Sequence, residues 1–199
     1  MIKINDNFLN LQEGYLFSIV NKKIKDFEDQ HPNKKVIKLG IGDVTLPLCK
    51  NVVEEMKKAC DEMGDIKNKI VEWDYKSRGI ELDVNEIFIS DGAKCDVSNI
   101  LDLFDTNNKV AIQDPVYPVY LDSNVIGGRS GNYNKDNDKY NNIIYMPSIE
   151  ENEFVPDLPN EVADIIYLCS PNNPTGTALK YEELKKWVDY AKENKSIIF

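Results

Sequence analysis

The sequence predicts an α/β protein built on a mostly parallel sheet. In the second half of the chain, short apolar runs alternate with amphipathic stretches, as strands and crossover helices do in parallel sheets. One run, residues 164–169, is almost continuously apolar, which is typical of a strand buried on both faces. The chain has 199 residues, 42% of them hydrophobic, which is enough for one substantial core or for one domain plus an arm.

Local patterns predict the individual elements. Residues 12–30 predict an amphipathic helix because apolar side chains recur every three or four positions, and Pro32 ends it. After this helix at 12–30 we expect an extended run at 36–39, a helix at 50–63 closed by Gly64, a strand at 86–89 and a helix at 92–104. A strand at 109–113, a helix at 117–126, a solvated loop at 132–142 and strands at 143–146 and 164–169 follow. The last elements are a helix at 181–193, with Leu184, Trp187, Val188 and Ala191 facing inward, and a strand from 196.

The last apolar run gives a further expectation. Chain termini usually lie at the surface, yet Ile197, Ile198 and Phe199 are all apolar. This pattern predicts a strand that is cut short and a sheet that is incomplete in this chain. Exposed strand edges and uncovered apolar faces favour association.

Charge and cysteine content exclude several kinds of partner. The formal net charge is −10, which argues against nucleic acid or an anionic membrane as the main partner but leaves small anionic ligands open. The four cysteines form no C-x-x-C pair and there is a single histidine, so a zinc site is not expected. With no signal peptide and no apolar run of membrane length, a cytoplasmic location is expected.

Two loops follow predicted strands and contain residues suited to a flat, phosphorylated ligand. Residues 90–94, Ser-Asp-Gly-Ala-Lys, lead from a strand into a helix whose first amides and positive dipole end favour phosphate. The alternative is an ordinary turn capped by Ser90 or Asp91. In residues 114–120, two prolines stiffen a loop in which Tyr117 or Tyr120 could stack on a ring. The alternative there is a crossover with tyrosines packed beneath it.

A third loop, residues 170–176, also follows a buried strand directly. Its sequence Ser-Pro-Asn-Asn-Pro-Thr-Gly restricts the backbone to one path, from which an asparagine amide can reach a ligand oxygen. The alternative is a plain turn before the last helix. Gly14-Tyr15 and residues 39–43 are weaker candidates, and they do not form the G-x-G-x-x-G fingerprint of dinucleotide sites.

These three loops, in this order, resemble the fold type I aminotransferases of class I/II, which depend on pyridoxal 5'-phosphate (PLP). In that family an N-P-x-G motif follows a buried strand, and here residues 173–176 carry it. Residues 14–17, 39–45, 89–96 and 114–120 support the same resemblance, which covers nearly the whole chain. It implies a three-layer, mostly parallel sheet of a PLP-binding large domain at residues 46–199, truncated at its C-terminus. Residues 1–45 would form an N-terminal arm and part of a small domain.

The resemblance also implies roles for individual residues. The backbone of Ala93 and Lys94 would hold the PLP phosphate, Tyr117 would stack on the pyridine ring, and Asn173 would donate a hydrogen bond to the 3′ oxygen. The implied substrate-binding residues are Tyr15, Gly42, Lys94, Tyr117 and Asn173.

This chain departs from the family pattern in two places. The family's Schiff-base lysine lies well beyond the N-P-x-G loop, so no catalytic residue is expected in these 199 residues and Lys94 is not that lysine. The family also has a G-Y-x-x-x-x-G segment with a phosphate-binding tyrosine, whereas here residues 65–69 run almost directly into residues 70–73. About a turn and half a helix are therefore expected to be absent.

The resemblance implies that the complete protein transfers an amino group between glutamate and a cyclic precursor of LL-diaminopimelate in lysine synthesis. It implies amino-acid and keto-acid substrates, a homodimer, and neither nucleic acid nor membrane as partner. We expect this chain alone to be an inactive fragment. Two alternatives remain open: a different fold type I aminotransferase or C–S lyase, and a non-catalytic protein that still binds phosphorylated ligands.

Overall fold

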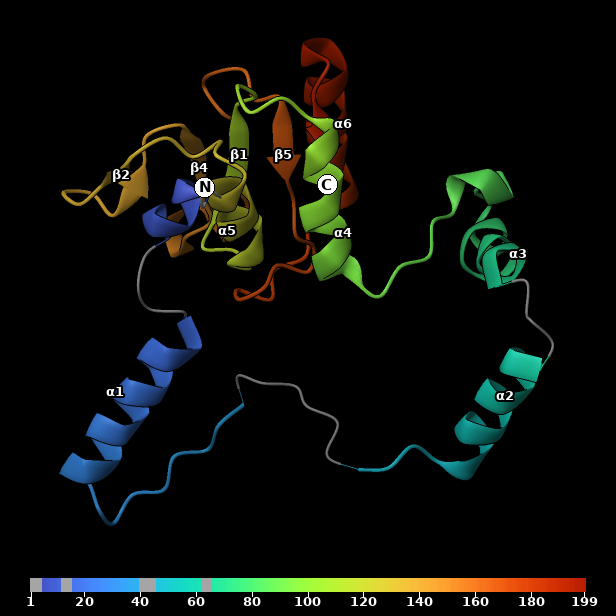
Figure 1. The fold of residues 1–199 in the computed structure, drawn as a ribbon, viewed down its shortest axis with the longest axis horizontal. Helices are drawn as coiled ribbons and strands as arrows, with labels where there is room; N and C mark the ends of the chain where they lie inside the picture. The colour runs from blue at the N-terminus through green and yellow to red at the C-terminus, as the bar shows by residue number, and fades with distance from the viewer. Residues whose placement is uncertain (1–4, 12–15, 40–45, 62–65) are drawn as a thin grey trace, which may run out of the picture. The chain divides into compact units, whose positions relative to one another are not determined.

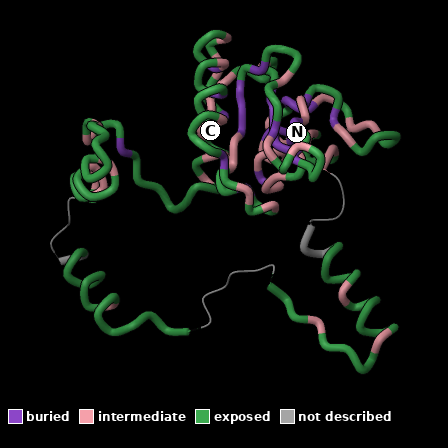
Figure 2. The backbone as a smooth tube through the Cα atoms, turned by 180° about the vertical axis from the view of Figure 1, so that it is seen from behind, coloured by how far each residue is buried: buried purple, intermediate pink, exposed green. Residues whose placement is uncertain are grey.

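The computed structural model of the chain describes residues 5–11, 16–39, 46–61 and 66–199. The chain divides into two compact units, one made of Met1–Asn21 with Gly92–Phe199 and the other of Lys22–Asp91. Buried residues are concentrated in the first unit (Figure 2). The domain boundary expected between residues 45 and 46 stays a prediction.

The first unit is built around a parallel sheet of four strands (Figure 1). Its order is β4 (Ile143–Pro147), β1 (Val110–Asp114), β5 (Ile165–Tyr167) and β6 (Ile197–Ile198), and every neighbouring pair is parallel. In the register, Ile112 lies opposite Tyr145 on one side and Tyr167 on the other. The predicted α/β class and the parallel sheet are confirmed, with strand bounds within two residues of those expected.

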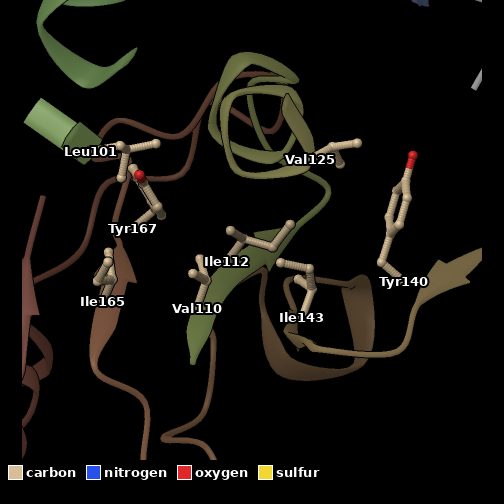
Figure 3. Close-up of a cluster of buried hydrophobic side chains, with 8 residues drawn as sticks. All are labelled: Leu101, Val110, Ile112, Val125, Tyr140, Ile143, Ile165 and Tyr167. Carbon is tan, nitrogen blue, oxygen red and sulfur yellow. The ribbon is translucent and has the colours of Figure 1, made fainter. Parts of the chain in front are cut away.

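Helices cover both faces of this sheet, so the unit has three layers. On one face lie α4 (Ala93–Asn99), the 3₁₀ helix η5 (Ile100–Leu103) and α5 (Val119–Ile126); on the other lies α6 (Tyr181–Asn194). Strand side chains alternate between the faces, because successive residues of a strand point in opposite directions. Figure 3 shows the core on the α5 side, formed by Leu101, Val110, Ile112, Val125, Tyr140, Ile143, Ile165 and Tyr167.

The opposite face packs on a narrower stripe of α6 than the sequence predicts. Trp187 and Ala191 are buried against Ala111 and Ile166, but Leu184 and Val188 are 39% and 44% exposed. The inward orientation expected for Leu184 and Val188 was therefore wrong. At 100° per residue, Val188 lies 100° round the helix from Trp187, whereas Leu184 lies only 20° from Ala191 and is exposed in the first turn of α6.

Two other local predictions were wrong. Residues 86–89 do not form a strand: Val84–Glu86 is a 3₁₀ turn (η4) capped by Asp83, and no described strand pairs with the residues that follow. A strand needs a partner for its backbone groups, which periodicity alone does not supply. The prediction of a solvated loop at residues 132–142 was wrong in part: residues 135–138 are exposed, but β2 (Tyr133–Asn134) and β3 (Lys139–Tyr140) form a hairpin with a Tyr133–Tyr140 ring contact.

The helices predicted in the first half of the chain are confirmed where they are described. They are α1 (Leu16–Gln30) and α2 (Lys50–Asp61), followed by α3 (Ile66–Ile70), a π-helical turn η2 (Val71–Tyr75) and η3 (Lys76–Arg78). His31 ends α1 by stacking on Phe27 and donating its amide to the Phe27 carbonyl at 2.9 Å. Residues 36–39 have no regular structure, and Gly64 lies outside the described residues.

The N-terminal residues that are described belong to the sheet unit. The short helix η1 (Asp6–Asn10) is held on both sides, since Asn5 Nδ2 donates to the Ile126 carbonyl at 3.2 Å and the Tyr140 hydroxyl donates to the Asn10 carbonyl at 2.8 Å. The remaining short helix is η6 (Glu150–Asn152). None of the helices within the described ranges has the length and apolar character needed to cross a membrane.

Arg129 is a buried cation that the sequence did not reveal. It is 4% exposed, and its guanidinium donates to the carbonyls of Leu101 at 2.6 Å, of Phe104, and of Asp105 at 3.3 Å. These carbonyls belong to the end of η5 and the residues just after it, where the helix dipole favours positive charge. Arg129 thus joins the end of α5 to the end of η5.

We expect Arg129→Met to lower the free energy of unfolding by about 1–3 kcal/mol, because hydrogen bonds from a charged donor to buried carbonyls are lost. Urea unfolding followed by circular dichroism measures this change. Arg78→Met is the matched control, since Arg78 is exposed and should change stability little. Equal effects of the two substitutions would contradict the role assigned to Arg129.

Candidate cofactor site

The predicted site residues that the structure describes, Ala93, Lys94, Tyr117 and Asn173, lie along one edge of the sheet. In Figure 1 the arrow of β5 points to the lower edge, where α4 begins and the loop after β5 lies. Because β1 and β5 are parallel neighbours, their carboxyl ends meet at this same edge. This edge is where open α/β sheets bind their ligands.

The start of α4 is suited to an anion. Gly92 has φ +137° and ψ 156°, and no described heavy atom lies within 4 Å of where a Cβ would stand. The amides of Cys95 and Asp96 donate to the Gly92 carbonyl at 3.1 and 3.2 Å, so the helical hydrogen bonds begin there. The amides of Ala93 and Lys94 precede them, at the end where helices favour negative charge.

Lys94 adds positive charge beside the first turn of α5. Burial raises the pKa of the Asp122 carboxyl above its usual range, and the nearby Lys94 ammonium opposes that shift. A hydrogen bond of 2.9 Å between the hydroxyls of Ser98 and Ser123 joins α4 to α5. This bond, near the end of α4, holds α4 against the helix that follows the Tyr117 loop.

Tyr117 stands at the end of a series of aromatic rings. It is partly buried and meets Tyr120 edge-on, with ring centroids 5.8 Å apart. Tyr120 stacks on Tyr167 at 5.0 Å, and Tyr167 contacts Phe199 at 5.5 Å. Burial and the neighbouring Cys169 raise the pKa of Tyr120 to about 12, so its hydroxyl stays neutral at physiological pH. The core thus fixes the ring on which Tyr117 rests.

Asn173 lies in the loop after β5 and is exposed. Its backbone N–H donates to Cys169 Sγ at 3.4 Å, and the Cys169 thiol donates to the Pro171 carbonyl at 3.3 Å. The Cys169 amide in turn donates at 2.6 Å to Oε1 of Gln113, a side chain only 1% exposed. The backbone that carries Asn173 is therefore anchored to the buried sheet, while its side chain remains accessible to a ligand.

Sequence reasoning missed one residue of this region. Asn172 is 3% exposed and bonds both to its own loop and to the loop after β1, whereas only Asn173 was predicted to have a role. The one available signal was the repeated asparagine directly after a buried strand. Of the other predicted residues, Tyr15 and Gly42 lie outside the described residues.

Among the described residues, two further hollows lie along the sheet. One, of about 670 Å³, runs beside β4 from Ile143 to Pro147 and is lined by none of Gly92, Tyr117 and Asn173. A polar hollow of about 330 Å³ lies at the opposite, amino edge of the sheet, lined in part by Asn108, Lys109 and Asn142. It contains no strand carboxyl end. Within the described ranges, no three histidine, cysteine or acidic side chains gather as metal ligands would.

Residues 34–199 match the family described as aminotransferase class I and II. The chain belongs to this family. It is 49% identical over 213 residues to an LL-diaminopimelate aminotransferase of Agathobacter rectalis, covering 100% of this chain and 53% of the relative. It is also 49% identical to an LL-diaminopimelate aminotransferase of Methanosphaera stadtmanae, covering 99% of this chain and 51% of that protein. The chain thus spans about half the length of these curated relatives.

Solved structures agree with this assignment. The L,L-diaminopimelate aminotransferase of Chlamydomonas reinhardtii superposes with a TM-score of 0.80 at 35% identity, covering 99% of this chain and 52% of that structure. The chain also shares the fold of an aspartate aminotransferase of Thermotoga maritima, with a TM-score of 0.73 at 19% identity. This match covers 98% of this chain and 52% of that structure. The predicted family resemblance and three-layer fold are confirmed.

The match to the Agathobacter rectalis protein extends over 213 residues, more than the 199 of this chain. That relative therefore carries residues within the matched span that this chain lacks. The location predicted for such a gap, residues 65–70, stays a prediction.

The cofactor of this family is PLP. The described residues fit that group: its phosphate suits the open space at Gly92 and the first amides of α4, and its flat ring suits the exposed side of Tyr117. Each feature lies at the carboxyl edge of one sheet. Both features belong to the unit that contains Gly92–Phe199.

Proposed function

We propose that the protein at its natural length is an LL-diaminopimelate aminotransferase of lysine biosynthesis. It transfers an amino group between LL-2,6-diaminopimelate and 2-oxoglutarate. The observation that carries this proposal is the identity of 46–49% to three relatives of that name, each matched over 99–100% of this chain. Relatives with other substrates resemble the chain much less, as the 19% identity to an aspartate aminotransferase indicates.

In this proposal the chain's own residues place the cofactor. The Ala93 and Lys94 amides bind the phosphate, Tyr117 packs on the ring, and Asn173 donates to the ring's 3′ oxygen. When bound, PLP supplies an electron sink for the bonds broken at the substrate's α-carbon, and the protein supplies placement and electrostatics. Substrate contacts are proposed for Tyr15, Gly42, Lys94, Tyr117 and Asn173.

We also propose a cytoplasmic homodimer. Free thiols at Cys49 and Cys169 are typical of a reducing compartment. Large apolar side chains such as Leu39 and Phe88 are 88% and 85% exposed in the unit Lys22–Asp91, and exposed apolar surface favours association. Sedimentation of the protein at its natural length tests the dimer.

The proposed substrate is tested by measuring amino transfer with the protein at its natural length, supplied with PLP and 2-oxoglutarate. LL-diaminopimelate, aspartate and alanine are compared as donors, with glutamate formation as the readout. A kcat/KM highest for LL-diaminopimelate supports the proposal. A preference for aspartate or alanine would assign the protein to another branch of the family.

Cofactor placement is tested separately with Asn173→Ala. We expect the Kd of pyridoxine 5'-phosphate to rise about tenfold, because a hydrogen bond to a charged or strongly polarised oxygen is worth about 1.5 kcal/mol or more. This ligand lacks the aldehyde and cannot react with surface lysines. Calorimetric titration gives the Kd, and thermal melts should coincide.

Asn160→Ala is the control for this substitution, because Asn160 is exposed and directly precedes Glu161, which pairs with Lys109 at the amino end of β1. Its affinity for the ligand should equal that of the unsubstituted chain. If Asn173→Ala also binds unchanged, Asn173 is a turn residue and not a cofactor ligand.

A further inference from the structure

Asn172 connects the two loops that follow the central strands. Its Nδ2 donates to the Pro115 carbonyl, in the loop after β1, at 3.1 Å. The same group donates to Thr175 Oγ1, in its own loop after β5, at 3.0 Å. The two bonds use both of its amide hydrogens, one in each loop.

The backbone of Asn172 is held as firmly as its side chain. Its amide donates to the Thr177 carbonyl at 2.8 Å, and its carbonyl accepts from the Gly176 amide at 2.6 Å. These bonds close the loop after β5 on itself. The link to Pro115 is therefore a bond between two defined loops, and a movement of one is transmitted to the other.

Burial makes this link strong and costly to remove. Asn172 is 3% exposed, and its Oδ1 atom is buried without a hydrogen-bond partner among the described residues. Leaving a buried polar atom unpaired destabilises a fold, so such a residue is retained where its other bonds need that position. Water does not compete effectively for Nδ2 at this depth.

We infer that Asn172 is a positioning residue that sets the loop of Tyr117 and the loop of Asn173 relative to each other. The inference rests on the proposed function, in which those two residues hold the cofactor ring. Pro115 lies two residues before Tyr117, and Asn172 directly precedes Asn173. One buried side chain thus links the two loops that carry the proposed ring-binding residues.

The first test is hydrogen exchange of the Val116 and Tyr117 amides in Asn172→Ala, measured on the full chain without ligand. Loss of the link should speed exchange in this other loop about fivefold or more, the change expected when one buried hydrogen bond is lost. Thr175→Val is the matched control: it removes the two bonds that Thr175 Oγ1 accepts within the loop, from Asn172 Nδ2 and from the Thr177 amide, and leaves the bond to Pro115. Its effect at Val116 and Tyr117 should be small.

The second test compares two ligands. In Asn172→Ala the Kd of pyridoxine 5'-phosphate should rise about tenfold, while the Kd of inorganic phosphate, bound by the start of α4 alone, should not change. Equal weakening of both ligands would indicate general unfolding and would overturn the inference. Asn172→Asp serves as the nearly isosteric second variant, since it keeps the volume and loses both Nδ2 donors.

The outcomes separate this inference from the proposed function. If the unsubstituted chain does not bind pyridoxine 5'-phosphate, the proposed cofactor site fails, and the exchange measurement still decides whether the loops are coupled. If the chain binds the ligand, and both Asn172 variants keep the affinity and the exchange rates of Val116 and Tyr117, Asn172 is not a positioning residue.

Discussion

Replacing Trp187 with alanine is expected to lower the free energy of unfolding by about 3–5 kcal/mol, the range found when large aromatic side chains are truncated in cores. Trp187 is 2% exposed and packs with Ala111, Met146 and Ile166. It is the largest side chain on this face, and it attaches α6 to the sheet. Smaller neighbours such as Ala111 cannot fill the cavity left behind.

Urea unfolding measures this loss, and the chain supplies a matched control. Its second tryptophan, Trp73, is 68% exposed and lies in the unit Lys22–Asp91. Trp73→Ala should change the unfolding free energy of the sheet unit little. A loss below about 1 kcal/mol for Trp187→Ala would mean that α6 is not anchored by this side chain.

The central elements could be predicted because their signals are local. The continuous apolar run that contains β5 and the apolar periodicity of α1 and α6 are properties of a few consecutive residues. Their order then restricts the topology, because strands that alternate with helices form parallel sheets with right-handed crossovers.

The errors concern properties that depend on distant residues. Ile87 and Phe88 have the composition of a strand, but strand formation requires a partner, and none is present in the described part of the chain. Leu184 and Val188 have the same apolar character as Trp187, yet both are exposed, and helical periodicity alone does not say how far the packed face of α6 extends. Arg129 gave no sequence signal, because its three carbonyl partners lie more than twenty residues earlier.

In the candidate site, too, some features could be predicted from local sequence and others depend on distant residues. Its three loops could be recognised because each carries glycine or proline ahead of a helix, and two of them directly follow the strands β1 and β5. The different environments of Asn172 and Asn173 could not be predicted, since the two are adjacent and chemically identical. The carbonyl of Pro115, 57 positions earlier, lies beside Asn172, which is buried, while Asn173 stays exposed.

The start of α4 carries the largest expected effect on binding. Gly92→Ala should raise the Kd of pyridoxine 5'-phosphate and of inorganic phosphate by about 10- to 100-fold. At φ +137° and ψ 156° an L-residue is strained, and such strain costs about 1–3 kcal/mol, which the chain relieves by rotating the backbone that presents the Ala93 and Lys94 amides. The added methyl group also occupies the open space in which the phosphate is expected.

Gly79→Ala separates this effect from general strain. Gly79 also has a positive φ, +76°, with no described atom within 4 Å of the added Cβ, and it belongs to the other unit. Both substitutions should lower the melting temperature, but only Gly92→Ala should weaken the two phosphate ligands. If Gly92→Ala binds both as tightly as the unsubstituted chain, the phosphate lies elsewhere. If Gly79→Ala weakens them equally, backbone strain acts through stability and not through the α4 amides.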